Sequence, residues 1–360
     1  MSGKDFRFSA NGTVSTPLRV FFLCGSYFDK NSKDKRIVLR DFIETLSQSF
    51  KSLILEDHFS FRKDEKLLNY NEIKMKSLRD IELLTGLFAD NIFILHECIS
   101  TAAELGLFSG NPYISDKIIL LTPDFYSVEE NFISGFISLA FNNSYFKDYN
   151  IENINYFPGV EKIEISENKK KYHTYFINNE LPLELKNIID NKLSPLKNSL
   201  NIKVIENKSR QRKRSNNIYY NIQDSVGYIY LHPHILSALL IALFNIDAVR
   251  TKLRGSKNIY DCINALWDYL VLLMNNTVRH ESAGLYDINN VKFLLIGIDM
   301  EPKKAVSYFV YILLALDLIQ LRKDQSEGLT IRMEFKDVYA NYKSLIIEMT
   351  PSNIKEVLSI

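Results

Sequence analysis

The stretch PLRVFFLCGS at residues 17–26 opens the part of the chain that decides the fold. Its apolar run, 18–23, predicts a buried strand, and the Cys-Gly-Ser that follows predicts a tight turn. Similar apolar runs alternate with segments of helical spacing further along the chain. Strands are expected at 52–55, 91–95 and 117–122, and helices at 34–51, 71–89 and 101–109. Continuous apolar strands alternating with helices predict a parallel, Rossmann- or flavodoxin-like sheet covered on both faces.

Length and composition are those of an ordinary folded protein. The chain has 360 residues, 46% of them hydrophobic and 24% charged, and a formal net charge of +1. This balance excludes collagen, coiled-coil rods and disordered tails, and makes a uniformly basic nucleic-acid coat improbable. Three widely spaced cysteines cannot form a disulfide framework or a zinc cluster, which favours a reducing compartment. Without a signal peptide or a long apolar run, a soluble, cytoplasmic protein with no membrane contact is expected.

The pattern divides the chain into four parts. Residues 1–16 are expected to be flexible, 17–150 to form the α/β domain, 151–225 to be a linker or intermediate region, and 226–360 to be mostly helical. Within the last part, 289–298 and 303–316 are expected as helices and 318–334 as a hairpin. Helix, helix and hairpin in that order predict a winged-helix element.

Polar side chains follow the expected strands, where ligands bind to parallel sheets. Glu56 and Asp57 end the second strand, and His96 and Glu97 end the third. A helix is then expected near Thr101, with Glu104 in its first turn. Thr101 and Glu104 also fit a capping box, so a purely structural role for Glu104 remains an alternative.

An ordered set of motifs resembles a known superfamily. FFLCGS, LILED and AAELGLFS resemble, in the same order, the nucleoside 2-deoxyribosyltransferase-like superfamily, and more narrowly the retron effector proteins that carry such a domain. The resemblance covers about residues 17–125. A C-terminal winged-helix region occurs in that effector group as well.

The resemblance implies roles for individual residues. Glu104 matches the catalytic glutamate, which attacks the anomeric carbon of a nucleoside. Glu82 matches an acidic position before the third strand, and so does Asp90, for which a structural role at the strand entry is expected. Ile99-Ser100 stands where the family usually has a Gly-Ser or Gly-Thr step before the glutamate helix, so the loop could be less open, or Ser100 could take the role of the glycine. The substrate-binding residues implied in this way are Leu23, Cys24, Gly25, Ser26, Glu56, Asp57, Glu82, Glu97 and Ser100. Gly25 would let the backbone approach the ligand closely.

Several of these residues have simpler interpretations. Cys24 has no histidine placed to activate it, so packing is favoured over a nucleophilic role. His96 could give a proton to a leaving base, but a structural role is favoured. His232 and His234 lack a third ligand, so no metal is expected. No phosphate-binding loop is present, and no cofactor is expected.

Two features point to nucleic acid, each with an alternative. The basic run comprises Lys208, Arg210, Arg212, Lys213 and Arg214. It is dense enough to bind phosphates, or it is a solvated linker. The tyrosines at 219, 220, 228 and 230 could stack on bases, although their alternation favours an ordinary strand.

The combined interpretation is a toxin effector of a retron antiphage system. It would cleave, or transfer from, the N-glycosidic bond of a nucleotide or NAD. The resemblance implies that a reverse transcriptase and its multicopy single-stranded DNA restrain it, and that it forms a homo-oligomer or a larger assembly. Two alternatives remain: a nucleoside deoxyribosyltransferase of salvage metabolism, which would not need the C-terminal half, and a non-enzymatic, nucleotide-sensing DNA-binding regulator.

Overall fold

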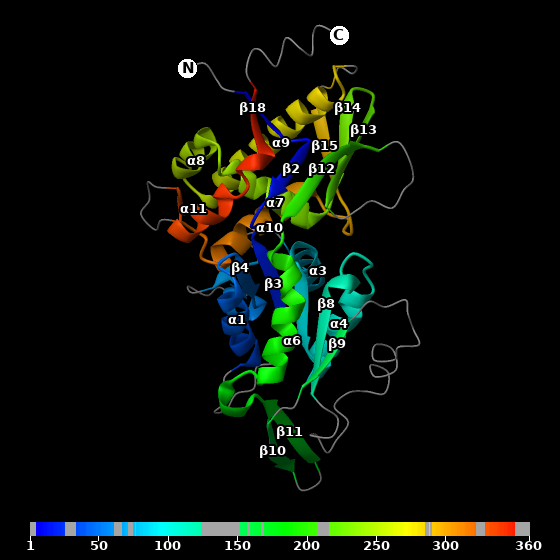
Figure 1. The fold of residues 1–360 in the computed structure, drawn as a ribbon, viewed down its shortest axis with the longest axis vertical. Coiled ribbons are helices and arrows are strands. Elements are labelled where there is room, and N and C mark those ends of the chain that lie inside the picture. The colour runs from blue at the N-terminus through cyan, green and yellow to red at the C-terminus, as the bar shows by residue number, and fades with distance from the viewer. Residues whose placement is uncertain are drawn as a thin grey trace. The chain divides into compact units, whose positions relative to one another are not determined.

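A computed structural model shows two compact units. It describes residues 5–25, 34–60, 67–70, 75, 77–123, 152–156, 159–166, 169–207, 216–284, 288, 290–321 and 328–349. Unit 1 comprises Met1–Pro17, Phe61–Lys76 and Asn198–Ile360, and unit 2 comprises Leu18–Ser60 and Ser77–Lys197. Each unit has its own five-stranded sheet (Figure 1).

The sheet of unit 2 is parallel throughout, as the sequence predicted. Its strands are β3 (Arg19–Cys24), β4 (Phe50–Leu53), β7 (Asn91–Leu95), β8 (Ile118–Pro123) and β9 (Glu152–Tyr156). Their order in the sheet is β4-β3-β7-β8-β9, and each neighbouring pair is parallel. The chain therefore reverses its direction of winding between β3 and β7. In doubly wound sheets, ligands bind in the crevice at the carboxyl ends of these two strands.

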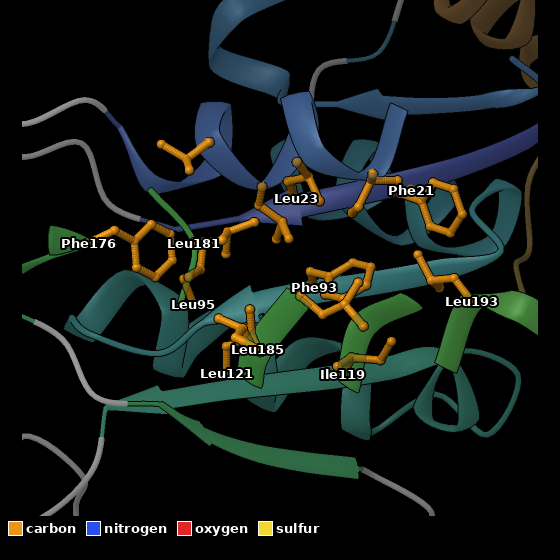
Figure 2. Packing of buried hydrophobic residues seen from close by; sticks show 14 of the residues in the cluster. Phe21, Leu23, Phe93, Leu95, Ile119, Leu121, Phe176, Leu181, Leu185 and Leu193 are labelled. Carbon is orange, nitrogen blue, oxygen red and sulfur yellow. The ribbon is translucent and has the colours of Figure 1, made fainter. Parts of the chain in front are cut away.

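One face of this sheet is covered by α1 (Lys35–Leu46) and α6 (Leu183–Leu193). Alternate strand residues such as Phe21, Phe93 and Leu121 form a fully buried cluster with Leu39 of α1 and Ile189 of α6 (Figure 2). The ring of Phe21 also contacts the ring of Phe50, with centroids 5.0 Å apart. The apolar strand pattern is thus explained by burial on two faces.

The other face is covered by α3 (Leu78–Phe88) and α4 (Ile99–Ser109). The rings of Phe22 and Phe108 meet edge to face, with centroids 5.9 Å apart. Lys117, which is half-buried, lies at the end of α3 and donates hydrogen bonds to three backbone carbonyls, those of Gly86, Leu87 and Ala89. These bonds satisfy acceptors that the helix end leaves open. Burial lowers the pKa of Lys117 to about 8.

Element boundaries in unit 2 differ from the sequence prediction at several points. The second strand ends at Leu53, so Glu56 and Asp57 lie in a short helix, α2 (Leu55–His58), after the strand. α3 begins at Leu78, seven residues later than the predicted start at 71, and its N-cap is Ser77. Beyond the parallel strands, unit 2 contains the antiparallel pair β10 (Gly159–Ser166) and β11 (Lys169–Tyr175).

The expected linker at 151–225 is folded wherever the structure describes it. Residues up to Lys197, including β9 and α6, belong to unit 2, and those from Asn198 belong to unit 1. The short elements η1 (Ser115–Lys117), η3 (Ile177–Asn179) and η4 (Ser194–Lys197) also lie in unit 2. Two-residue strands occur at β5 (Phe59–Ser60) and β6 (Leu68–Asn69).

The sheet of unit 1 is mixed. Its strands are β2 (Asn11–Val14), β12 (Leu200–Glu206), β13 (Asn217–Gln223), β14 (Val226–Leu231) and β15 (Asn290–Leu295), in the order β15-β14-β13-β12-β2. The β12–β13 and β14–β15 pairs are parallel, and the other two pairs are antiparallel. The helices of unit 1 are α7 (Pro233–Leu243), α8 (Asp247–Arg254), α9 (Ile259–Glu281), α10 (Pro302–Ala315) and α11 (Met333–Ala340).

The helix predicted at 289–298 is wrong. Residues 290–295 form strand β15, in which Val291 and Phe293 are buried while Asn290, Lys292 and Leu294 are exposed. This alternation has the period of a strand, and it outweighs the helical spacing that suggested otherwise. The helix and hairpin that follow are present, as α10 and the antiparallel pair β16 (Ile319–Leu321) and β17 (Leu329–Ile331).

The remaining described elements of unit 1 join its two ends. β1 (Asp5–Phe8) pairs antiparallel with β18 (Ile346–Met349), which follows η5 (Lys343–Leu345). Among the described residues no single helix is both long and apolar enough to cross a membrane, and only α7 and α8 taken together, bent by 89° at their junction, have sufficient length and apolar composition. Most residues of α7 are buried within unit 1.

Candidate functional site

The candidate site lies at the carboxyl ends of β3 and β7. Gly25 follows β3, and residues 96–98 connect β7 to α4. A Cβ atom at Gly25 would lie 3.0 Å from the side chain of Arg36 and 3.4 Å from that of Leu95. The structure therefore gives a reason for this glycine that the sequence did not reveal: room for the Arg36 side chain.

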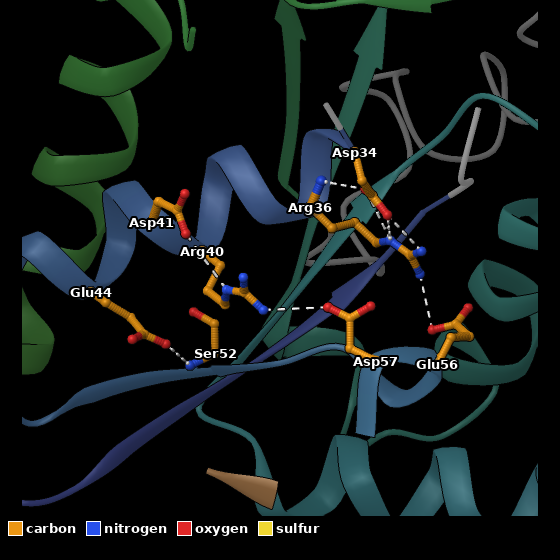
Figure 3. A network of polar contacts seen from close by, with 8 residues as sticks. All are labelled: Asp34, Arg36, Arg40, Asp41, Glu44, Ser52, Glu56 and Asp57. Atoms are coloured by element: carbon orange, nitrogen blue, oxygen red, sulfur yellow. Dashed lines mark hydrogen bonds and ion pairs between the residues drawn. The ribbon is translucent and has the colours of Figure 1, made fainter. Parts of the chain in front are cut away.

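Arg36 is the centre of a buried polar network at this edge (Figure 3). It is paired with Asp34 at 2.9 Å and with Glu56 at 2.9 Å. Asp34 is also the N-cap of α1 and accepts a hydrogen bond from the backbone NH of Arg36 at 2.8 Å. Burial lowers the pKa of Arg36, but its bonds to Asp34 and Glu56 raise it more, so the guanidinium stays charged. The Glu56 side chain is 63% exposed, so Glu56 is open to solvent although its partner Arg36 is buried.

Asp57 takes a different direction from its neighbour Glu56. Its Oδ2 lies 3.3 Å from Arg40 Nη1, on the second turn of α1. On the same flank, Glu44 accepts a hydrogen bond from the backbone NH of Ser52 at 2.9 Å (Figure 3). These contacts tie α1 to β4 and α2, which is a sufficient structural reason for Asp57.

The predicted capping box of Thr101 and Glu104 is wrong. α4 begins at Ile99, its N-cap is Cys98, and Thr101 occupies the third helical position. Thr101 Oγ1 accepts from the backbone NH groups of Glu97 and Cys98 and donates to the carbonyl of Cys98 at 2.8 Å. Thr101 therefore helps to hold the 96–98 loop without Glu104. Because the helix starts two residues early, Glu104 lies beyond the first turn and is not needed as a cap.

Glu104 is a carboxyl group with a strongly altered pKa. Burial, followed by the charges of Glu82 and Glu56, raises its pKa to about 8, while Arg36 acts in the opposite direction. Its Oε2 is buried and has no hydrogen-bond partner among the residues that the structure describes. A buried carboxyl oxygen without a donor is costly to folding, and such groups concentrate at functional sites.

Glu82 is the second altered carboxyl group. It projects from α3, and burial together with Glu56 raises its pKa to about 7. The charges of Glu56, Glu82 and Glu104 all act on Cys24, at the end of β3. The structure thus brings together four of the predicted site residues. They are Cys24 of β3, Glu56 of α2, Glu82 of α3 and Glu104 of α4. Neighbouring carboxyl groups with raised pKa values titrate as a coupled set.

Glu97, predicted to contact the substrate, is buried in an ion pair. Its carboxylate contacts the ammonium of Lys35, and both side chains are almost fully buried. The Lys35 ammonium also lies 5.9 Å from the centroid of the Phe176 ring. This pair links the start of α1 to the loop before α4, across the point where the winding reverses. The geometry favours a role for Glu97 in positioning that loop.

His96 and Cys24 are both buried. Burial lowers the pKa of His96, which favours a neutral imidazole, and its Nδ1 lies 3.5 Å from Thr101 Oγ1. Cys24 is 2% exposed, and burial, with the charge of Glu104 next in size, raises its pKa well above the usual value. A protonated thiol in this place packs and does not act as a nucleophile.

The other predicted residues lie in varied surroundings. The Leu23 side chain belongs to the buried core cluster, on the side of α1 and α6. Ser100 is exposed in the first turn of α4, and Ser26 lies outside the described residues. Asp90, for which a structural role was expected, accepts hydrogen bonds from Arg19 and from the backbone NH of Val20. That role is confirmed, because these bonds lie at the amino end of β3, opposite the candidate site.

Sequence reasoning missed Asp34, Lys35 and Arg36. A signal was present, because Asp34 directly before a helical pattern is a typical N-cap. What the pattern could not show is that Lys35 and Arg36 turn inward to meet Glu97 and Glu56.

Two further sequence features were considered for other ligands: the basic run for nucleic acid and the histidine pair for a metal. The basic run 208–214 lies outside the described residues. His232 and His234 have ring centroids 5.7 Å apart. No group of three or more His, Cys, Asp or Glu side chains in the described part of the chain is arranged to hold a metal ion.

Fold and site together define a class: an α/β protein whose parallel sheet carries a cluster of acidic groups at the reversal point. A family model described as the STM3845 retron effector protein matches residues 32–359. The chain therefore belongs to this retron effector family, and membership indicates a role in retron-based antiviral defence. No curated protein matches the chain.

Proposed function

We propose that unit 2 cleaves the N-glycosidic bond of a nucleotide or of NAD, with Glu104 as the catalytic carboxylate. The observation that carries this proposal is the Glu104 carboxyl group at the strand ends, whose pKa is raised to about 8 and whose buried Oε2 is bound by no described residue. The resemblance of the surrounding motifs to the deoxyribosyltransferase-like superfamily supports the choice of bond.

The chemistry suits a pair of carboxyl groups. As the C1′–N bond breaks, its electron pair leaves with the base nitrogen, and positive charge develops on the sugar ring. An ionised Glu104 facing C1′ stabilises that charge or bonds to the carbon. A purine or pyrimidine that leaves from a nucleotide takes up a proton, which the Glu82–Glu104 pair can hold at neutral pH because both pKa values are raised. The nicotinamide of NAD leaves as a neutral base and needs no proton.

The acceptor completes the reaction. When water adds to C1′, its oxygen bonds to the sugar and any bond between C1′ and Glu104 breaks. One proton of the water replaces the proton that the base took from the carboxyl pair, or is released to solvent when the leaving group is nicotinamide. When a second base adds, the outcome is transfer. Arg36 contributes by keeping a positive charge near the carboxyl groups. Its partner Glu56 is exposed to solvent on the other side of the ion pair.

The biological role that fits family membership is that of a toxin under restraint. The effector would be held inactive by a reverse transcriptase and its multicopy single-stranded DNA in a shared assembly, and released during infection. Loss of a nucleotide pool would then stop growth of the infected cell. Family membership supports association with the retron system.

The test compares the wild type with Glu104→Gln in cells that lack the retron partners. We expect the wild type to stop growth and to deplete one nucleotide pool, measured by liquid chromatography of cell extracts. Glu104→Gln keeps the shape of the side chain but removes the carboxylate, so growth and pools should stay normal.

The matched control is Glu184→Gln, an exposed acidic residue on α6 of the same unit. It should behave as the wild type does. Equal toxicity of wild type and Glu104→Gln would refute the assigned chemistry, and so would growth arrest without change in any nucleotide pool. A harmless wild type with normal pools would refute the toxin role.

A further inference from the structure

The Arg36 side chain lies between two carboxylates that differ in exposure (Figure 3). Its Nε donates to both oxygens of Asp34, at 3.3 and 3.2 Å, and its Nη2 donates to Asp34 Oδ2 at 2.9 Å. Its Nη1 donates to Glu56 Oε2 at 2.9 Å. Asp34 and Arg36 are buried, whereas the Glu56 side chain is 63% exposed. A guanidinium held at three nitrogens has little freedom to move, so it fixes the place of the exposed carboxylate.

Gly25 lies against the middle of the Arg36 side chain. A Cβ atom at Gly25 would lie 3.0 Å from both Cγ and Cδ of Arg36. Carbon atoms in favourable contact are about 3.5–4.0 Å apart, so Arg36 would have to move. Because its guanidinium is anchored, this movement would lengthen the bonds to Asp34 or Glu56. The φ angle of Gly25 lies outside the left-handed region, so the backbone there does not itself require glycine.

Glu56 is the exposed member of the acidic cluster. Burial is the largest cause of the raised pKa values of Glu82 and Glu104, and the charge of Glu56 adds to both. The interaction between two charges falls with their separation, so the contribution of Glu56 depends on where its carboxylate is held. The ion pair with Arg36 holds it there. Arg36 thus acts on the two buried carboxyl groups through a third.

We propose that Gly25 and Arg36 act together as positioning residues of the candidate site: the missing side chain of Gly25 leaves room for Arg36, and Arg36 fixes Glu56 beside Glu82 and Glu104. The inference rests on the function proposed for Glu104. It gives Gly25 a different role from the one that the resemblance implies, which is close approach of the ligand. Clearance for a ligand predicts that Gly25→Ala weakens binding, whereas clearance for Arg36 predicts that it slows the reaction.

The next turn of α1 provides a matched control. Arg40 Nη1 lies 3.3 Å from Asp57 Oδ2, so consecutive residues of α2 pair with arginines one turn apart on α1 (Figure 3). The Arg40 side chain is 27% exposed and that of Arg36 is 4% exposed. Arg40→Met therefore breaks the same kind of ion pair between the same two helices, and it controls for the loss of helix contacts.

The first test measures base release by purified variants. Gly25→Ala should lower kcat by up to about 100-fold with little change in KM, since small displacements at a reaction site can cost this much. Asp34→Ser with Arg36→Ala removes both members of the buried pair, while serine keeps the helix cap, and it should lower kcat to a similar extent. In that background Gly25→Ala should have no further effect, because Cγ and Cδ of Arg36 are gone. Arg40→Met should behave as the wild type does.

The second test needs no substrate, so its failure is distinct from failure of the proposed function. Protein made by cell-free synthesis with 13C-labelled glutamate is titrated by NMR, and the Glu82 signal is the one that Glu82→Gln lacks. Hydrogen exchange of the β7 amides checks that each variant is folded. The charged and titratable groups around Glu82 and its partner Glu104 are Glu56, Cys24, Cys98 and Arg36.

The expected shift of the Glu82 titration has a definite sign. Glu56→Gln removes a negative charge, so the pKa of Glu82 should fall below about 7. Gly25→Ala should shift it in the same direction, because Glu56 without its anchor is repelled by its acidic neighbours and moves into solvent. Arg40→Met should leave the titration unchanged.

Three results would overturn the inference. One is an equal loss of kcat from Gly25→Ala in the wild type and in the Asp34→Ser, Arg36→Ala background. Another is a rise in KM with kcat unchanged, which would show that Gly25 makes room for a ligand. The third is a Glu82 titration that Gly25→Ala does not alter. If the wild type releases no base, the proposed function fails, and the Glu82 titration still decides whether Gly25 and Arg36 fix Glu56.

Discussion

The two sheets of this protein differ in how many of their faces are buried. In unit 2 all strands are parallel, and helices cover both faces, so polar chemistry is confined to the strand ends. In unit 1 the sheet is mixed, and one face packs on α9 while the other stays half-exposed. Polar and aromatic groups can therefore gather on the face itself.

This difference decides where polar side chains gather: at the strand ends in unit 2, and across one sheet face in unit 1. At the strand ends of unit 2, burial and neighbouring carboxylates raise the pKa values of Glu82 and Glu104. On the half-exposed face of the unit 1 sheet, strand register instead sets Ile205, Tyr219, Tyr230 and Leu294 side by side.

The largest expected effect tests the difference in burial. Phe93→Ala removes a fully buried ring from the middle of β7, and it should lower the free energy of unfolding of unit 2 by about 3–5 kcal/mol. Hydrogen exchange of the β7 amides measures this loss directly.

The counterpart in unit 1 is Leu294→Ala on β15, where the side chain is 40% exposed. Its effect should stay within about 0.5 kcal/mol, as for ordinary surface substitutions. Trp267, the one tryptophan of the chain, lies in unit 1 and reports its unfolding by fluorescence. Similar losses from the two substitutions would contradict the contrast between the sheets.

Much of unit 2 was readable from the sequence. The run 91–95 was predicted as a strand with its observed boundaries, because five apolar or neutral residues lie between a turn and a polar loop. The parallel sheet followed from such runs. In unit 1 the strand 290–295 was misread as a helix, since a short apolar segment fits both periods and only long-range pairing with β14 decides.

The site was predictable in its residues and not in its contacts. Glu104 and Glu82 were named from motifs, and the structure places both within one electrostatic cluster. Glu97 was also named, but its burial with Lys35 depends on how α1 meets the loop after β7. Such a contact joins residues far apart in the chain, and no local pattern encodes it.

The next effect is on the pH dependence of the proposed cleavage, through the proton that Glu82 and Glu104 would share. With pKa values of about 7 and about 8, the pair carries one proton between these limits, so cleavage should follow a bell-shaped pH profile. Glu82→Gln should lower the rate by about 100-fold and abolish one limb of the bell. A profile unchanged by Glu82→Gln would remove Glu82 from the reaction.

The smallest effect is on stability and depends on pH. The pKa of Glu104 rises from 4.5 to about 8 on folding, so its ionisation destabilises the folded state progressively across that range. Glu104→Gln should therefore be neutral near pH 4.5 and stabilise unit 2 by about 1–2 kcal/mol at pH 8, after allowance for solvent screening. Tyr219→Phe in unit 1 should show no such dependence on pH, and exchange of the β7 amides at both pH values checks the contrast.

The most direct measurement is the release of free base by the purified protein. Wild type, Glu104→Gln and Glu184→Gln are each incubated with a panel of nucleosides, nucleotides and NAD, and the products are separated by liquid chromatography. The account predicts base release by the wild type and by Glu184→Gln, and a loss of at least about 1,000-fold in Glu104→Gln. Equal base release by Glu104→Gln and wild type, or no release from any member of the panel, would contradict it.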